Sequence, residues 1–203
     1  MGSDVSRGRY PVSPDEAVWA DAPFDAAKVF GRVAPLEIEI GSGKARFLIE
    51  SARRNPAGNF LGLELALAYY RICRDRLARA DLPNARIVRA DGRRFAQAAL
   101  PAASVRAFHV YFPDPWPKKR QRKRRLLDHA GLEILASRLE PGGLLRIATD
   151  HAGYAASVEP LLASVATLEE LDWTLLPSPP ETHYELKYRQ EGRPVRRFLL
   201  RRR

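Results

Sequence analysis

A glycine-rich turn after a short apolar run carries the first residues that could do chemistry. Residues 39–44 read EIGSGK and precede a helical pattern. Glycines such as Gly41 and Gly43 at a strand-to-helix turn let a ligand approach the backbone closely. The dinucleotide-binding fingerprint requires a third glycine where Arg46 stands, and a carboxylate at Glu39 would repel a pyrophosphate. The turn therefore favours a cationic nucleoside ligand, and S-adenosylmethionine has this chemistry.

Two further acids follow the next two apolar runs. Glu64 closes the second run, 23 residues after Gly41, and Asp91 follows the third. An acid at the first of these positions binds ribose hydroxyls in dinucleotide-binding folds. Because the carboxyl ends of parallel strands lie at one edge of a sheet, we expect Glu39, Glu64 and Asp91 to face one crevice. A solvated strand end would explain any one of these acids, but it explains the set poorly.

A stiff loop follows the fourth apolar run. Residues 112–117 read FPDPWP, and the prolines on both sides of Asp114 hold the backbone extended. The segment is similar to the acid-Pro-Pro-aromatic loop of methyltransferases that modify base nitrogens, in which the polar residue contacts the edge of the base and the aromatic ring stacks on it. For Trp116, core packing and base contact are both open. Asp114 is the candidate catalytic residue.

The net charge of +10 is concentrated in two segments. Residues 118–125, KKRQRKRR, carry seven positive charges, and residues 187–203 carry eight with one acid, so the remainder of the chain is net negative. Such clustering is typical of a polyanion-binding face. Nucleic acid is the leading candidate partner and an anionic membrane surface is the second. Lys118 directly follows the stiff loop, so phosphate-binding charge adjoins the proposed reacting centre.

The composition excludes several other classes of protein. No stretch approaches the roughly 18 apolar residues of a membrane span, and the first 20 residues lack the apolar centre of a signal peptide, so a cytoplasmic protein is expected. The single cysteine cannot form an intramolecular disulfide, and the four histidines lack metal-ligand spacing, so no metal is expected. Cys73 falls on an apolar helical stripe, which predicts a core residue.

Short apolar runs alternate with helical patterns from Leu36 onward, which predicts an α/β fold with a parallel sheet and helices on both faces. Residues 126–139 are expected to form a helix that stops at Pro141, with a fifth strand over 144–149. Two late strands would complete a seven-stranded sheet with an antiparallel edge. Residues 1–34 form a predicted loop-rich N-terminal arm, and residues 35–203 form a single domain.

Several of these motifs together resemble one family. The chain resembles the bacterial tRNA (guanine-N7)-methyltransferases, which modify guanine 46 in the variable loop of tRNA. The resemblance covers about 36–203, and PDPWPKKR is its most specific part. The motifs that carry it are EIGSGK, GLEL, AD at 90–91, FPDPWPKKR, KRR, ATD at 148–150 and THYE at 182–185.

This resemblance implies a Rossmann-like, class I S-adenosylmethionine-dependent methyltransferase fold. It places Glu39, Glu64, Asp91 and Asp114 in contact with S-adenosylmethionine, together with the turn glycines, and makes Asp114 the catalytic residue. The tRNA would be held by Lys118, Asp150, Thr182, His183, Tyr184 and Glu185. Family members often have glycine where this chain has Ala45, whose methyl group would lie where the helix begins near the cofactor.

Two other functions stay open at this point. A nicotinamide-dependent oxidoreductase shares the first half of the expected fold, although Arg46 and Glu39 disfavour its pyrophosphate turn. A non-catalytic RNA-binding module explains the basic segments but not the acids at the strand ends. The sequence is compatible with a monomer or a homodimer.

Overall fold

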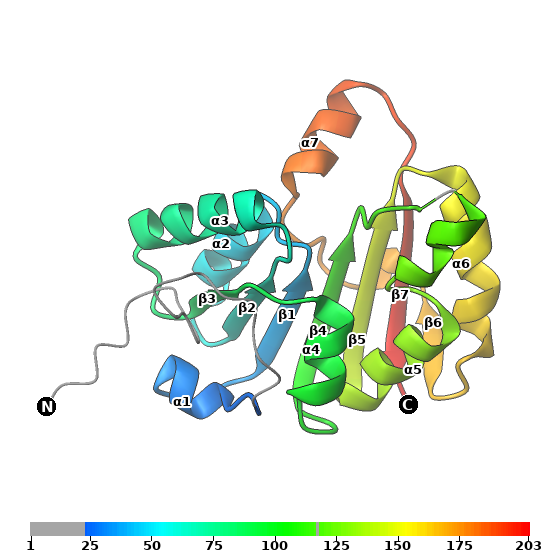
Figure 1. The fold of residues 1–203 in the computed structure, drawn as a ribbon. Coiled ribbons are helices and arrows are strands. Elements are labelled where there is room, and N and C mark those ends of the chain that lie inside the picture. The colour runs from blue at the N-terminus through cyan, green and yellow to red at the C-terminus, as the bar shows by residue number, and fades with distance from the viewer. Residues whose placement is uncertain (1–22, 117) are drawn as a thin grey trace, which may run out of the picture.

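A central sheet of seven strands organises the described part of the chain, residues 23–116 and 118–203 of a computed structural model (Figure 1). The order of the strands is β3-β2-β1-β4-β5-β7-β6. All neighbouring pairs are parallel except those of β7, which runs antiparallel to both β5 and β6. The strands are β1 Leu36–Ile40, β2 Asn59–Leu63, β3 Ala85–Val88, β4 Val105–Tyr111, β5 Leu139–Thr149, β6 Leu168–Leu171 and β7 Arg196–Arg202. This arrangement confirms the predicted fold class and the antiparallel edge.

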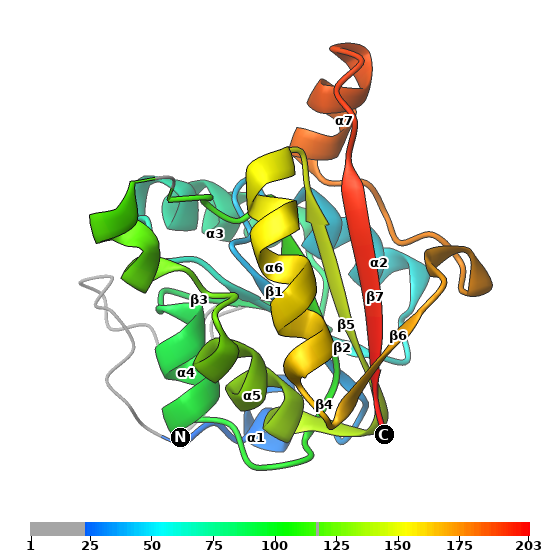
Figure 2. The same ribbon diagram turned by 90° about the vertical axis from the view of Figure 1, so that its right-hand side faces the viewer.

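Helices cover both faces of this sheet, as the side view in Figure 2 shows. The elements are α1 Ala26–Phe30, α2 Arg46–Arg54, α3 Leu67–Ala80, α4 Gly92–Ala98, α5 His129–Arg138, α6 Ala152–Ser164 and α7 His183–Gln190, with 3-10 turns at Lys119–Arg124 and Trp173–Leu175. One buried cluster joins the sheet to α4, α5 and α6, and a second joins β2 and β3 to α2 and α3. Helix α7 projects from the carboxyl edge of the sheet (Figure 1).

The first strand shows how the sequence distributes its side chains between the two faces. Leu36 and Ile38 are buried in the cluster beneath α4, α5 and α6. Glu37 and Glu39 lie on the opposite face, because successive side chains of a strand alternate. The pattern LEIEI therefore places two acids on the face that α2 covers.

The boundary between α5 and β5 differs from the prediction. The helix ends at Arg138, and β5 begins directly at Leu139, so that Pro141 lies within the strand. The register of the β4–β5 pair shifts between Val105 and Ala107, and Gly142 has φ +78°. The proline and glycines thus form an irregularity within a strand, where the prediction had a helix stop followed by a separate strand.

The N-terminal arm is described only in part. Within the described residues of the predicted arm, α1 packs Val29 and Phe30 into the main core, so this end of it is helical. Residues 1–22 lie outside the described residues, and the division at residue 34 stays a prediction. No described helix combines the length and the apolar character that crossing a bilayer requires.

Candidate active site

A cavity of about 340 Å³ lies where the carboxyl ends of β1 and β4 meet α7. The turn 41–44 and Glu39 line it from the first strand, and Tyr111 lines it from the fourth. The start of α3 contributes Tyr69, and residues 182–184 contribute the start of α7. A cavity thus lies at the predicted edge of the sheet, but of the three acids expected to face one crevice only Glu39 lines it. Two segments that the sequence did not connect with the turn, α3 and α7, help to enclose it.

The glycine turn has a backbone that leaves room for a ligand. Gly41 has φ +85° and Gly43 has φ +53°, conformations that residues with a side chain rarely adopt. A Cβ atom built on either glycine would meet no atom within 4 Å, so the space beside the turn is open. Ala45 also has φ +58°, a left-handed conformation that costs an alanine about 1–2 kcal/mol. Its methyl group belongs to the buried cluster of α2 and α3.

Contacts from the second strand and α3 hold this turn from below. Glu64 is buried, and its Oε2 and Oε1 atoms accept hydrogen bonds from the backbone N–H groups of Gly43 and Ala66, each at 2.9 Å. The Sγ atom of Cys73 lies 3.1 Å from the carbonyl oxygen of Gly43 and donates to it. Cys73 is fully buried, which confirms the predicted core position. The turn is thus held before any ligand binds.

Glu39 presents a buried carboxylate to the cavity. The residue is 4% exposed, and its Oε2 atom has no hydrogen-bond partner. Burial raises the pKa of Glu39 well above its ordinary value, and the Glu64 carboxylate raises it further, while the nearby Ser42 hydroxyl offsets only part of this. A cationic ligand would supply the missing partner. The donor set therefore fits a sulfonium or ammonium group and disfavours an anion at this position.

Helix α7 is joined to α3 across the mouth of the cavity. The Thr182 hydroxyl caps the helix by accepting from the backbone N–H of Glu185 at 3.0 Å. His183 Nε2 lies 3.1 Å from an Nη1 atom of Arg76. The hydroxyl of Tyr69, followed by partial burial, raises the pKa of Tyr184 to about 12. These contacts bring the THYE motif against the site and give Thr182 a structural role in addition to its predicted one.

An aromatic group connects α7 to the stiff loop. The ring of Tyr184 lies 6.2 Å from that of Phe112 and 5.9 Å from that of Tyr188, measured between centroids. The guanidinium of Arg193 covers the ring of Tyr188 at 4.7 Å. Tyr188 and Arg193 carried no sequence signal beyond the charge count of their segment.

The loop after β4 is strained and tied down. Phe112 has φ +53° and Trp116 has φ +41°, and backbone strain of this kind is typical of functional sites. The Arg125 side chain donates to the carbonyl oxygens of Pro115 at 2.9 Å and Trp116 at 3.4 Å, and its guanidinium also covers the ring of Tyr154. Trp116 is half-buried beneath the guanidinium of Arg124, at 5.1 Å. The basic run therefore contains a loop anchor, although its composition predicted only phosphate contacts.

The second basic segment is not the free cationic surface that its composition predicts. All eight of its basic side chains have partners. Six form ion pairs with carboxylates, for example Arg196 with Glu159 and Arg201 with Glu169. Arg202 and Arg203 donate to the backbone carbonyls of Leu139 and Ala166. Carboxylates from other parts of the chain thus pair with five of these eight cations, and Glu191 of the segment itself pairs with Lys187.

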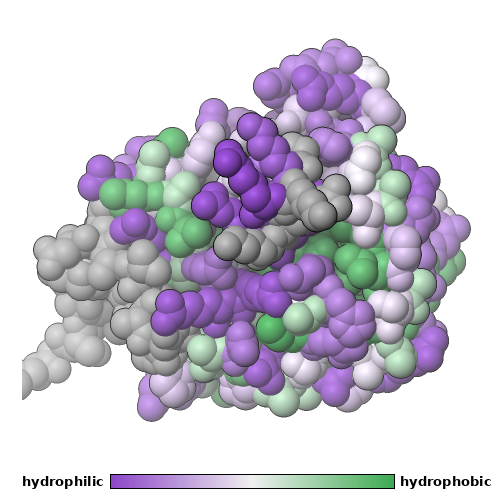
Figure 3. Space-filling model, turned by 45° about the vertical axis from the view of Figure 1, so that its right-hand side comes forward, coloured by the Kyte–Doolittle hydropathy of each residue, from purple (hydrophilic) through white to green (hydrophobic). Residues whose placement is uncertain are grey.

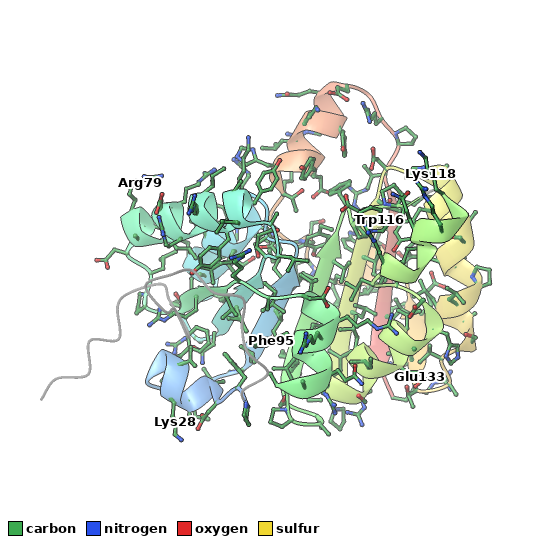
Figure 4. All side chains as sticks on the ribbon, in the orientation of Figure 1. Lys28, Arg79, Phe95, Trp116, Lys118 and Glu133 are labelled. Atoms are coloured by element: carbon green, nitrogen blue, oxygen red, sulfur yellow. The ribbon has the colours of Figure 1, made fainter. Side chains whose placement is uncertain are left out.

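The predicted site residues fall into three groups. Those lining the cavity are Glu39, Gly41, Gly43, Thr182, His183 and Tyr184. Those near it with other contacts are Glu64 beneath the turn, Asp150 paired with Arg193 at 3.3 Å, and Glu185 paired with Arg197. Those outside the cavity lining are Asp91, which is exposed and caps α4 by accepting from Arg94, and the exposed residues Asp114 and Lys118. In Figure 4, Lys118 lies beside Trp116.

A buried polar network beneath the cavity escaped the sequence reasoning. His109 Nδ1 lies 3.0 Å from the hydroxyl of Tyr111, and its Nε2 lies 2.9 Å from Glu37 Oε2. Burial lowers the pKa of His109. The hydrogen bond with Glu37 and the charge of Glu37 offset only part of this decrease. The neutral imidazole thus fixes the orientation of a tyrosine that lines the cavity. The alternation of residue types in LEIEI at 36–40 and in HVY at 109–111 was the sequence pattern from which this network could have been predicted.

The part of the molecule that projects at the top of Figure 3, formed by α7, is mostly hydrophilic. Among the residues that the structure describes, no group of His, Cys, Asp and Glu could hold a metal ion.

Comparisons with known proteins point to one family. The family model of a putative methyltransferase matches residues 33–198. The chain is 38% identical to a tRNA (guanine-N(7)-)-methyltransferase of Nocardia farcinica, over 88% of this chain and 71% of that protein. It is 34% identical to the protein of the same name from Nitrosomonas eutropha, over 90% of this chain and 83% of that protein.

Solved structures share the fold. The aminoglycoside resistance methyltransferase NpmB1 superposes with a TM-score of 0.60 at 21% identity, covering 83% of this chain and 87% of that chain. At this identity the likeness shows the architecture of the fold alone.

Proposed function

Because the chain belongs to the family of tRNA (guanine-N(7)-)-methyltransferases, which are S-adenosylmethionine-dependent enzymes, we propose that it methylates N7 of guanine 46 in the variable loop of tRNA. The observation that carries this proposal is the buried carboxylate of Glu39. It lies in a cavity beneath an open glycine turn, and it lacks the partner that a cation would supply.

The residues around the turn fit S-adenosylmethionine. Glu39 would face its positive charge, while Gly41 and Gly43 leave space for it beside the backbone. Glu64 has lone pairs beyond the two hydrogen bonds that it accepts, and these are available to ribose hydroxyls. Asp91 is an exposed acid that follows the third strand, and it is the third strand-end acid proposed to contact the cofactor. When bound, the cofactor supplies an electrophilic methyl group on sulfur.

The protein's own task in this reaction is positioning. Guanine N7 carries an in-plane lone pair and no proton, so the attack requires no general base. Holding the two reactants in line therefore supplies most of the acceleration. Asp114 would accept hydrogen bonds from the N–H groups of the guanine and would stabilise the positive charge that develops on the ring. Arg125 would act through the loop, because it holds the carbonyls of Pro115 and Trp116, the two residues that follow Asp114.

Substrate contacts are proposed for the groups on the rim of the cavity. Lys118 is exposed next to the loop and would bind phosphate. Residues 182–185 form the start of α7, and Asp150 pairs with Arg193 just beyond its end. The neighbouring rings of Phe112, Tyr184 and Tyr188 offer a surface on which a base can stack.

The two other functions raised by the sequence are not favoured. A nicotinamide cofactor would place a pyrophosphate against the Glu39 carboxylate, which is unfavourable. A module that only binds RNA has no use for a buried acid in a cavity. The proposal of a cytoplasmic enzyme that acts as a monomer or a homodimer rests on the sequence.

One experiment tests the reaction and its position together. The protein is incubated with methyl-labelled S-adenosylmethionine and an unmodified tRNA transcript, and the digested nucleosides are separated. We expect label in 7-methylguanosine. The matched control is the same transcript with adenosine at position 46, which is expected to take up no label. Label in another nucleoside, or equal label in both transcripts, would overturn the proposal.

A further inference from the structure

A groove between α2 and α3 holds arginines that no basic run in the sequence marks. Arg46 and Arg53 of α2 and Arg76 and Arg79 of α3 line it. The groove has a volume of about 390 Å³. Arg46 also lines the cavity beside the glycine turn, so the two spaces adjoin. We refer to these four residues and the space between them as the arginine groove.

The charge of the arginine groove is largely uncompensated. Its lining contains one acid, Glu50, which pairs with Arg53 at 3.0 Å. The guanidinium groups of Arg46 and Arg79 have no hydrogen-bond or ion-pair partner among the described residues, and the Nε atom of Arg46 is buried. Within the described part of the chain, the hydrogen-bond partner of Arg76 is the neutral imidazole of His183, which carries no negative charge. Four guanidinium groups against one carboxylate leave a strongly positive surface.

The same positive charges act on His183, which lies beside the arginine groove. Burial lowers the pKa of His183, and the charges of Arg76, Lys44 and Arg46 lower it further. His183 therefore stays neutral at neutral pH and adds no charge of its own. The guanidinium contact leaves the imidazole able to accept a hydrogen bond from Arg76.

The ligand that fits such a surface is a chain of phosphates. A guanidinium group binds phosphate through paired N–H donors, and several of them on two rigid helices match a polymer better than a single anion. We propose that the arginine groove binds the phosphate backbone of the RNA substrate, as an extension of the site that begins at the cavity. This inference rests on the proposed function for the identity of the polymer.

The position of the groove sets the path of the RNA. Figure 4 shows Arg79 and Lys118 on opposite sides of α7. The cavity adjoins the arginine groove, because Arg46 lines both and because His183, which lines the cavity, contacts Arg76. A strand whose guanine enters the cavity would therefore continue along the basic run on one side and into the arginine groove on the other. Six of the eight cations in residues 187–203 are paired with carboxylates, so this segment is expected to contribute less to this path.

The test compares two double variants that remove the same charge. Arg53→Ala with Arg79→Ala alters the groove without touching the cavity lining. Arg196→Ala with Arg201→Ala is the matched control, taken from the neutralised segment. Affinity for an unmodified tRNA transcript is measured by fluorescence anisotropy between about 50 and 200 mM salt. Calorimetry with S-adenosylmethionine and thermal unfolding are recorded for each protein.

The tRNA affinity of the groove variant should depend less steeply on salt than that of the parent protein. Each lost phosphate contact lowers the slope of log K against log salt by about 0.7 for a single strand and about 0.9 for a duplex. If two contacts are lost, the ratio of the parent's tRNA affinity to that of the variant should fall about seven- to twelvefold as the salt concentration rises fourfold. The control should keep the slope of the parent, and both variants should keep its cofactor affinity.

Several outcomes would overturn the inference. An unchanged slope in the groove variant would do so, as would a loss of cofactor affinity with tRNA affinity intact. Loss of binding to anionic lipid vesicles with an unchanged tRNA slope would assign the groove to a membrane surface instead. If the double variant fails to fold, Arg79→Ala alone is measured, with half the change in slope expected. A groove variant that behaves like the parent, while the parent methylates the transcript normally, would refute the groove and leave the proposed function standing. A parent that neither binds nor methylates the transcript would refute both.

Discussion

The Oε2 atom of Glu64 accepts a hydrogen bond from the backbone N–H of Gly43 at 2.9 Å. Its other oxygen accepts from the N–H of Ala66 at the same distance. One carboxylate thus joins the turn after β1 to the turn after β2, and both turns belong to the proposed cofactor site. The acid that the sequence assigned to a ribose has a second task, which is to shape the backbone that faces the ligand.

Replacing Glu64 should therefore weaken cofactor binding and stability together. In Glu64→Ala, loss of a charge-assisted hydrogen bond worth about 1.5–3 kcal/mol lowers S-adenosylmethionine affinity about ten- to a hundredfold. Calorimetric titration measures this change, and tRNA affinity is expected to stay within a factor of about two. Glu64→Gln, which keeps one acceptor oxygen, should lie between. Unchanged cofactor affinity in Glu64→Ala would remove this residue from the site.

Cofactor affinity should rise with pH through Glu39. Burial raises the pKa of the free carboxyl group, so the group is protonated over a wider range of pH than usual. A bound cation favours the ionised form, so binding releases a proton wherever the free group is protonated, and affinity falls as pH falls below the raised pKa of the free group. Calorimetry in two buffers of different ionisation enthalpy counts the protons. Glu39→Gln should bind more weakly and lose this part of the proton release, and an identical count in both proteins would contradict the role of Glu39.

Asp114→Ala should separate chemistry from binding. Asp114 is exposed on a strained loop, where it is proposed to stabilise charge on the guanine. Its loss is expected to slow single-turnover methylation by about 10²–10³-fold, as for the loss of one oriented electrostatic group. Rapid-quench measurement with labelled cofactor gives the rate, and anisotropy should show nearly unchanged tRNA affinity. A near-normal rate in this variant would exclude Asp114 as the catalytic residue.

Arg125 and Arg120 should respond differently although they belong to one basic run. Arg125→Ala removes the donors to Pro115 and Trp116, so it should lower the free energy of unfolding by about 2–3 kcal/mol and reduce turnover, with the tRNA salt slope unchanged. Arg120 is exposed, so Arg120→Ala should flatten that slope by about 0.7–0.9 and leave stability intact. Chemical denaturation and salt titration of both proteins check this contrast. The reverse pattern would contradict the loop-anchor role.

Local sequence patterns predicted the fold well because each pattern reports its own element. The alternation of apolar runs with helical patterns gave the parallel sheet, and the stripe through Cys73 gave the buried face of α3. The predicted helix stop at Pro141 was wrong because proline and glycine occur both at helix ends and in irregular strands. Only the pairing with β4 decides between the two. The ends of α7 had no apolar stripe to mark them, since none of its residues is buried.

Charge patterns were less reliable than motifs because a sequence does not show which acids face which bases. Arg196 and Arg201 belong to a conspicuous basic run, yet Glu159 and Glu169 from other elements neutralise them. Arg46 and Arg79 belong to no run, and helix geometry brings them to one groove. The motif residues Glu39 and Gly43 both line the cavity, because the end of a strand fixes the edge of the sheet at which they lie.

Because the Cys73 thiol contacts the carbonyl oxygen of Gly43, the rate at which this thiol is labelled can be used to follow opening of the turn. Burial raises the pKa of this thiol far above its usual value, so an alkylating reagent can react only when α3 and the turn separate. Since the chain contains one cysteine, the rate of modification reads a single site. The opening frequency of the cofactor turn can thus be followed by mass spectrometry of the intact protein, and a ligand that binds the turn should slow the labelling.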